Sequence, residues 1–167
     1  MKILIIGAGA IGIWVASQIR QHDPDGKHAV ILLGRPRFVA AANADGIQVS
    51  HLQAPAQPLQ NVTPIAALAD LPASATPLDV VIVCTKAYSV PSVIADLQAG
   101  QVTNPTLMDS RTRVLAFQNG VGSEEAFGAA FGMFLLSGTP EARSGLPFGG
   151  LFGGGFGIVM GIGTGIT

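Results

Sequence analysis

The sequence predicts an α/β fold in which a parallel sheet is flanked by helices, and three observations favour it. The chain opens with an apolar, largely β-branched run at 2–6, a glycine-rich turn follows at 7–12, and a helical stretch covers 11–21. Further apolar runs then alternate with helical stretches, which is the pattern of βαβ units. With 167 residues the chain suffices for one such domain with a sizeable core.

The expected strands at 2–6, 29–33 and 79–84 are short apolar runs without polar alternation, which is typical of strands buried on both faces. The turn residues Asp-Pro-Asp-Gly at 23–26 end the first helix. The proline-rich segment 53–78 has no clear period, so we expect a loop there with one short helix near 64–70. Ser123 is the expected N-cap of the last helix. In chain order, we expect strands at 2–6, 29–33, 47–52, 79–84 and 113–117, and helices at 11–21, 38–44, 88–98 and from 123 onward.

Composition excludes some classes of partner. The formal net charge is −1, so no electrostatic argument exists for binding nucleic acid or an anionic membrane surface. The single cysteine, Cys84, cannot form an internal disulfide, and no signal peptide is recognisable at the N-terminus. We therefore expect a cytoplasmic protein.

The segment 144–167 differs from the rest of the chain. It carries no charged residue, and ten of its 24 residues are glycine, which destabilises helices and strands alike. A membrane span is compatible with its length but is the less favoured interpretation, because so much glycine makes the segment poorly apolar. We expect a folded domain over 1–143 and a loosely ordered tail, or the remnant of a longer domain, over 144–167.

The turn at 7–12 has the pattern Gly-x-Gly-x-x-Gly between a strand and a helix, which is the dinucleotide-binding signature of a Rossmann-type sheet. Gly7 permits the tight turn, Gly9 lets backbone amides approach a pyrophosphate, and Gly12 lets the helix pack close to the strand. The alternative is a glycine-rich turn without a ligand, which the strand and helix on either side disfavour. The expected cofactor contacts are Gly7, Ala8, Gly9, Ala10, Ile11 and Gly12.

The end of the second strand selects the nucleotide. NAD-selective sites place an acid there to bind the ribose 2′-hydroxyl, whereas this chain has Arg35. A guanidinium binds a 2′-phosphate with paired hydrogen bonds. Arg35 therefore favours NADPH as the cofactor; the alternative is that Arg35 and Arg37 are only solvated loop charges.

Two further polar residues follow strand ends. Lys86 comes after the third buried strand and Asn119 after the fourth, so both are expected at the rim where ligands of such sheets collect. Taken singly, a snorkelling lysine and a turn-forming Asn-Gly pair remain the simpler interpretations. Cys84 is expected to be a small core residue and not a nucleophile. No metal site is expected, since His22, His28 and His51 share no metal-ligand spacing.

Together these segments resemble the ketopantoate reductase (2-dehydropantoate 2-reductase) family of pantothenate biosynthesis. The resemblance covers residues 1–128 and rests on four motifs in the order of the family. They are Met-Lys-Ile-Leu-Ile-Ile-Gly-Ala-Gly-Ala-Ile-Gly at 1–12, Gly-Arg at 34–35, Val-Cys-Thr-Lys-Ala-Tyr at 83–88 and Gln-Asn-Gly-Val-Gly at 118–122. The last two are much more specific than the first, which many dinucleotide-binding enzymes share.

The resemblance implies NADPH-dependent reduction of a small 2-oxo acid, ketopantoate, to pantoate. It implies that Arg35 binds the 2′-phosphate, that Lys86 binds the cofactor at the rim, and that Asn119 contacts both cofactor and substrate. The family's helical C-terminal domain, which supplies a general-acid lysine and a substrate-binding glutamate, is absent from the match, and the chain has no lysine after Lys86. No catalytic residue is therefore assigned, and the chain carries mainly the cofactor-binding half.

Two other interpretations remain open. The chain is an NADP-binding module or incomplete fragment without turnover, or it belongs to a flavin- or NAD-dependent family with the same fold. Fold alone does not decide between them.

Overall fold

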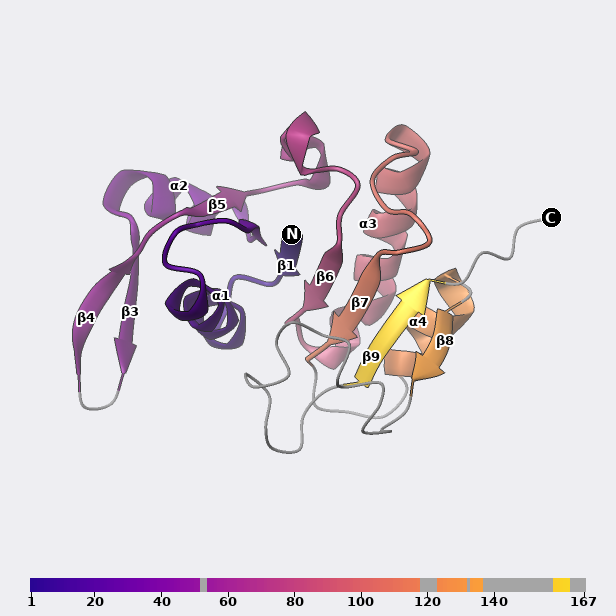
Figure 1. The fold of residues 1–167 in the computed structure, drawn as a ribbon. Helices are drawn as coiled ribbons and strands as arrows, with labels where there is room; N and C mark the ends of the chain where they lie inside the picture. The colour runs from indigo at the N-terminus through magenta and orange to yellow at the C-terminus, as the bar shows by residue number, and fades with distance from the viewer. Residues whose placement is uncertain (52–53, 118–122, 132, 137–157, 163–167) are drawn as a thin grey trace.

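The computed structural model describes residues 1–51, 54–117, 123–131, 133–136 and 158–162. Seven strands of these residues form one sheet in the order β5-β2-β1-β6-β7-β9-β8 (Figure 1). The first five strands of that order are parallel, so the predicted Rossmann-like parallel sheet with flanking helices is confirmed. Their bounds are β5 (Val62–Ile65), β2 (Ala29–Leu33), β1 (Lys2–Ile6), β6 (Val80–Val83) and β7 (Arg113–Ala116).

The sheet is covered on both faces, which explains why its strands are apolar without alternation. In β1, Ile3 and Ile5 pack on one face with Val15 and Ile19 of α1 (Ala10–His22). The alternate residues of β1 pack on the other face with α3 (Val90–Thr103) and α4 (Ser123–Phe131). The helix α2 (Pro36–Asp45) lies on the same face as α1, and its Phe38 packs against the same apolar cluster. The core therefore consists of two apolar layers with the sheet between them.

The helices occur where the sequence predicts them, with one difference at α3. A short 3-10 turn, η3 (Ala87–Ser89), precedes α3, and the helix continues to Thr103 instead of ending near residue 98. Gly100 lies in this added part of α3, and a Cβ on it would lie 3.0 Å from side-chain atoms of both Leu68 and Leu107. Glycine at that position lets α3 pack closely against its neighbours.

The expected loop over 53–78 is wrong for two of its parts. The segment contains β4 (Ala54–Leu59), which forms an antiparallel two-stranded sheet with β3 (Ile47–His51), and it contains β5. Two 3-10 turns follow, η1 (Leu68–Asp70) and η2 (Ala73–Ala75). Prolines at these strands made the sequence look irregular.

Proline is compatible with β5 because of how this strand is placed. β5 ends the strand order, and Ile65 turns its carbonyl toward β2, where it accepts a bond from the Gly34 amide. The backbone groups of successive strand residues alternate in direction, so the nitrogen of Pro64 lies on the outer edge. No ladder hydrogen bond is lost there.

The expectation of a loosely ordered tail over 144–167 misses one strand. Ile158–Ile162 forms β9, which pairs antiparallel with β7 and with β8 (Met133–Leu136). The rest of that tail lies outside the described residues. Within the described part of the chain, no helix has the length and apolar character needed to cross a membrane.

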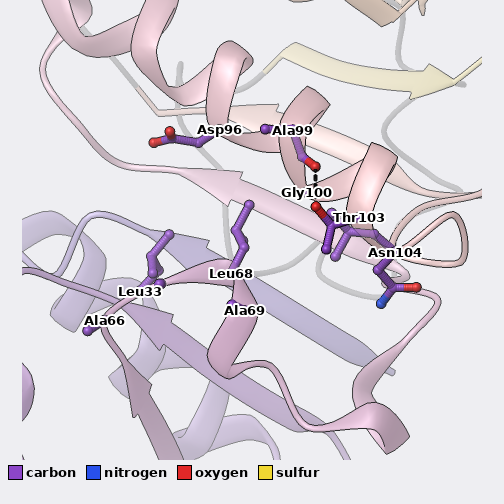
Figure 2. A pocket seen from close by; sticks show the side chains of 11 residues that line it. Leu33, Ala66, Leu68, Ala69, Asp96, Ala99, Gly100, Thr103 and Asn104 are labelled. Carbon is purple, nitrogen blue, oxygen red and sulfur yellow. Dashed lines mark hydrogen bonds between the residues drawn. The ribbon is translucent and has the colours of Figure 1, made fainter.

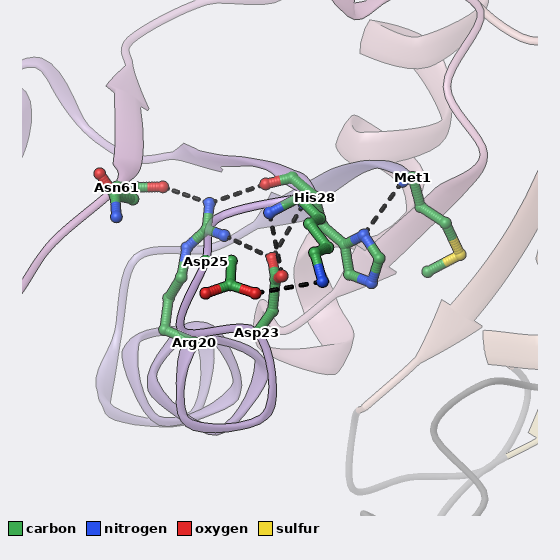
Figure 3. Close-up of polar contacts among 7 residues, drawn as sticks. Met1, Arg20, Asp23, Asp25, His28 and Asn61 are labelled. Carbon is green, nitrogen blue, oxygen red and sulfur yellow. Dashed lines mark hydrogen bonds and ion pairs between the residues drawn. The ribbon is translucent and has the colours of Figure 1, made fainter.

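A polar network fastens the C-terminal end of α1 to the strands beside it (Figure 3). The Arg20 guanidinium donates to the Asp23 carboxylate at 2.9 Å, to the His28 carbonyl at 2.9 Å and to the Asn61 carbonyl. Asp23 in turn accepts from the backbone amides of Lys27 and His28, each at 2.9 Å. The network fixes the start of β2, whose opposite end carries the candidate site.

Candidate functional site

The parallel strands end together at one rim of the sheet, where the chain changes face. The helix after β1 covers one face and the helix after the neighbouring β6 covers the other, so a crevice opens between these strand ends. Backbone hydrogen bonds hold the strand ends together at this rim. The amide of Gly7 donates to the carbonyl of Leu33 at 2.9 Å, and the amide of Cys84 donates to the carbonyl of Ile6 at 2.8 Å. The glycine turn is therefore held against the end of β2.

Two glycines of the turn are required by close contacts within the protein. Gly7 has φ +109°, and a Cβ on it would lie 3.0 Å from the backbone at Cys84 and Thr85. A Cβ on Gly12 would lie 2.0 Å from the Gly7 carbonyl oxygen. These contacts agree with the tight turn and the close helix packing that the sequence predicts for the two positions.

Gly9 differs from both. Its backbone is extended, with φ −93° and ψ −172°, and a Cβ on it would meet no atom within 4 Å. Nothing in the described protein therefore demands glycine at this position. A ligand lying against the turn would demand it, because a side chain would occupy the ligand's space.

The N-terminus of α1 is free to bind an anion. Gly9 is its N-cap, no side chain caps it, and its first turn holds no acid. The first helical bond runs from the Ile13 amide to the Gly9 carbonyl at 2.9 Å, so the amides before it have no partner in the helix. Such a helix end combines orphan donors with the positive end of the helix dipole.

A cleft of about 930 Å³ brings part of the predicted set together, and its volume is within the usual range for ligand sites. Its lining includes Gly7, Ala8 and Gly9 of the turn, Arg35 after β2 and Lys86 after β6. Ala10 and Ile11 are exposed in the first turn of α1, Gly12 is buried in it, and none of the three is among the described lining residues. Asn119 lies outside the described residues.

Charge is distributed unevenly over this cleft. Three cations line it, Arg35, Arg37 and Lys86, and one acid, Asp96, stands among the described lining residues. Arg35 is the N-cap of α2, and its carbonyl accepts bonds from the amides of Phe38 and Val39, which fixes its backbone beside the turn. Uncapped amides and three cations fit a ligand with several phosphates.

Cys84 is half-buried at the end of β6. Burial raises the pKa of its thiol to about 12. A thiol with such a pKa stays protonated near neutral pH and is a poor nucleophile. This agrees with its expected role as a small core residue, although it also lines the cleft.

The polar side of α3 was not predicted from the sequence. Ser89, the N-cap of α3, and Ser92 and Asp96 within that helix line the cleft. Their spacing of three and then four residues places them on one helical face, and this spacing was the available signal. Within the described ranges, no group of three or more side chains has the types and proximity of a metal site.

Comparison with known proteins gives one family match. A family model described as ketopantoate reductase PanE/ApbA matches residues 3–150, which extends the recognisable similarity beyond residue 128. A search of curated proteins found no match.

Several solved structures share the fold. A putative 2-dehydropantoate 2-reductase from Enterococcus faecalis superposes with a TM-score of 0.60 at 23% identity, covering 78% of this chain and 37% of that one. A ketopantoate reductase from Ralstonia eutropha gives 0.62 at 23% identity, covering 83% and 43%. D-mandelate dehydrogenase with NADH and anilino(oxo)acetate gives 0.59 at 23% identity, covering 77% and 37%. The chain thus spans less than half the length of these structures.

Proposed function

Because the chain belongs to the ketopantoate reductase PanE/ApbA family, we propose that it binds NADPH for the reduction of ketopantoate to pantoate. The described residues supply mainly the cofactor-binding half of that reaction. The solved structures with the same fold include reductases and a dehydrogenase, the latter with NADH bound. A nicotinamide cofactor is therefore the expected ligand of the cleft, and the preference for NADPH is the finer proposal.

One observation carries the proposal: an uncapped glycine turn and three cations line the same cleft. The amides at the start of α1 would hold the pyrophosphate, and Gly9 leaves the space that it needs. Arg35 would bind the 2′-phosphate, since it follows β2 and no acid stands beside it in the sequence. Arg37 lines the same cleft and would add a second positive charge.

The reaction also needs residues that bind and orient the substrate. The reduced nicotinamide supplies the hydride when it is bound. Lys86, exposed at the rim, would attract the substrate carboxylate or a cofactor phosphate. Asn119 would contact cofactor and substrate, as the family resemblance implies, and its amide can donate one hydrogen bond and accept another. The proton for the alkoxide must come from an acid, and the sequence offers no lysine after Lys86 for that role.

That missing lysine favours a second candidate function for the 167-residue chain taken alone. The chain would then bind NADPH without turnover, as a module that needs further residues for catalysis. General acid catalysis contributes about 10²–10⁴-fold to rate, so its loss would leave little activity.

Nucleotide titration tests the cofactor assignment. The sole tryptophan, Trp14, lies on α1 beside the glycine turn, so quenching of its fluorescence reports binding at this site. We expect tighter binding of NADPH than of NADH. Arg35→Ala should weaken NADPH about ten- to hundredfold and leave NADH nearly unchanged. Arg111→Ala removes the same charge from an exposed side chain outside the cleft lining and should change neither affinity. Equal affinities in the wild type would refute the assignment of Arg35.

A turnover assay separates the two candidate functions. NADPH absorbance is followed with ketopantoate and the 167-residue chain at saturating cofactor. Turnover within the range of ordinary enzymes, about 1–10³ per second, would support the reductase and place an acid within these residues. Binding without turnover would support the module.

A further inference from the structure

A second cavity adjoins the proposed cofactor cleft. It has a volume of about 470 Å³ and lies between α3 and the η1 segment (Figure 2). Leu33, Ala66 and Asp96 line both spaces, so the cavity continues the cleft beyond the end of β2. The remaining lining is mostly apolar or small: Ala67, Leu68, Ala69, Ala99, Gly100, Thr103, Asn104 and Leu107.

The two spaces differ in charge. Arg35, Arg37 and Lys86 line the cleft, whereas Asp96 is the sole charged residue among the described residues that line the cavity. Phosphates would therefore bind on the side of Arg35, away from the carboxylate of Asp96. An apolar planar group with a hydrogen-bond donor suits the cavity entrance, because its faces would bury against Leu33 and Ala66.

The carboxylate of Asp96 can accept hydrogen bonds from a ligand. It is exposed on α3, and within the described part of the chain its carboxylate has no hydrogen-bond or ion-pair partner. In Figure 2 the carboxylate lies toward the end of the cavity that carries Leu33 and Ala66, away from Asn104. An ionised carboxylate accepts hydrogen bonds only and rejects another acceptor facing it.

Resting on the proposed function, we propose that Asp96 is a specificity-determining residue that accepts a hydrogen bond from the exocyclic amino group of adenine. The 2′-phosphate that Arg35 would bind is attached to the ribose that carries adenine, so the base must lie next to Arg35. Leu33, Ala66 and Asp96 line both the cleft and the cavity, so a base that extends from Arg35 into the cavity would pass Leu33 and Ala66 and reach Asp96. The cationic and anionic ends of the site then fix the direction in which the dinucleotide binds.

The test compares NADPH with reduced nicotinamide hypoxanthine dinucleotide phosphate, in which a carbonyl oxygen replaces the amino group. Both keep every phosphate, so the ratio of their affinities isolates the base. We expect the wild type to prefer NADPH by about tenfold, the value of one charge-assisted hydrogen bond at an exposed site. Asp96→Ala should reduce the ratio to near one. Asp96→Asn should also bring the ratio close to one, because an amide can turn either its oxygen or its nitrogen toward the base.

Asp45→Ala is the matched control. It removes one negative charge from the exposed end of α2, outside both linings, and should keep the wild-type ratio while sharing any general gain in phosphate affinity. A wild-type ratio near one, or an unchanged ratio in folded Asp96→Ala, overturns the role of Asp96. A chain that binds NADPH no better than NADH overturns the proposed cofactor instead, so the two failures are distinguishable.

Discussion

The carbonyl oxygen of Gly7 occupies the space that a side chain on Gly12 would need, with only 2.0 Å between it and an ideal Cβ there. We expect Gly12→Ala to destabilise the chain by about 1–3 kcal/mol, because either the turn or α1 must move. Gly9→Val should leave the melting temperature near that of the wild type, since its Cβ has open space and its backbone is extended.

Nucleotide binding should separate the same two variants. Gly9→Val should nearly abolish NADPH binding in a folded chain, because the side chain enters the space proposed for the pyrophosphate. Thermal melts by circular dichroism and Trp14 fluorescence titration measure the two effects. Undiminished NADPH affinity in folded Gly9→Val would exclude the pyrophosphate from this turn.

Cys84 should react slowly with alkylating agents. With a pKa of about 12, its thiolate fraction at pH 8 is about 10⁻⁴, against about a quarter for a free cysteine. Iodoacetamide labelling of the folded chain should therefore be about 10³-fold slower than labelling in denaturant, and it should accelerate as pH rises. Mass spectrometry gives a clean readout because the chain has one cysteine. Equal rates in the folded and denatured chain would contradict the buried, protonated thiol.

Asp23 should make stability depend on acid pH. The His28 amide that donates to its carboxylate is the main cause that holds the pKa of Asp23 below its ordinary value; the Lys27 amide and Arg20 act in the same direction, against burial. A lowered pKa contributes stability above the unfolded value of about 3.9, and this stability is lost as pH falls through the folded value.

Asp23→Asn tests that contribution. Its melting temperature should fall below that of the wild type most strongly above about pH 5, with the gap narrowing on acidification. Asp25→Asn is the control two residues away, since its side chain is exposed in an ion pair with Lys27. A gap that stays constant with pH would show that the loss of Asp23 acts through packing alone.

Thr112 is buried and its hydroxyl is fully used. It donates to the Leu78 carbonyl at 2.6 Å and accepts from the Asp109 amide at 2.9 Å. Thr112→Val keeps the shape but removes both bonds, so we expect a loss of about 1–3 kcal/mol in the free energy of unfolding. Thr103→Val should cost less than about 0.5 kcal/mol, because that residue is exposed on α3. Urea denaturation measures both, and equal losses would contradict the role of the Thr112 hydroxyl.

The parallel core could be predicted from sequence because each strand buried on two faces is a continuous apolar run. The strand β5 could not be predicted in this way, because it contains Pro64. Proline fits a strand at the edge of a sheet, and which strand lies at the edge depends on the order of strands in space. The strand β9 could not be predicted either. It pairs with β7, which lies about forty-five residues earlier in the chain, and the sequence between them is rich in glycine. Local patterns carry no information about such distant pairings.

The candidate site shows the same division. Gly7, Gly9, Arg35 and Lys86 follow strand ends, so topology alone brings them to one rim, and the structure places all four in the cleft lining. Asp96 lies well inside α3, where an exposed acid looks like an ordinary solvated residue. Only the packing of α3 beside η1 gives it a cavity to face.

The position of Pro64 bears on how the chain behaves in concentrated solution. An open sheet edge offers a row of amide donors on which a second chain can grow intermolecular β-structure, the first step of edge-to-edge aggregation. Proline interrupts that row at the outer side of β5 while leaving the bonds to β2 intact. Pro64→Val would restore the donor and match the β-branched character of the strand, so light scattering should detect association at lower protein concentration than in the wild type. We therefore expect the residue that obscures β5 in the sequence to act as a gatekeeper against self-association.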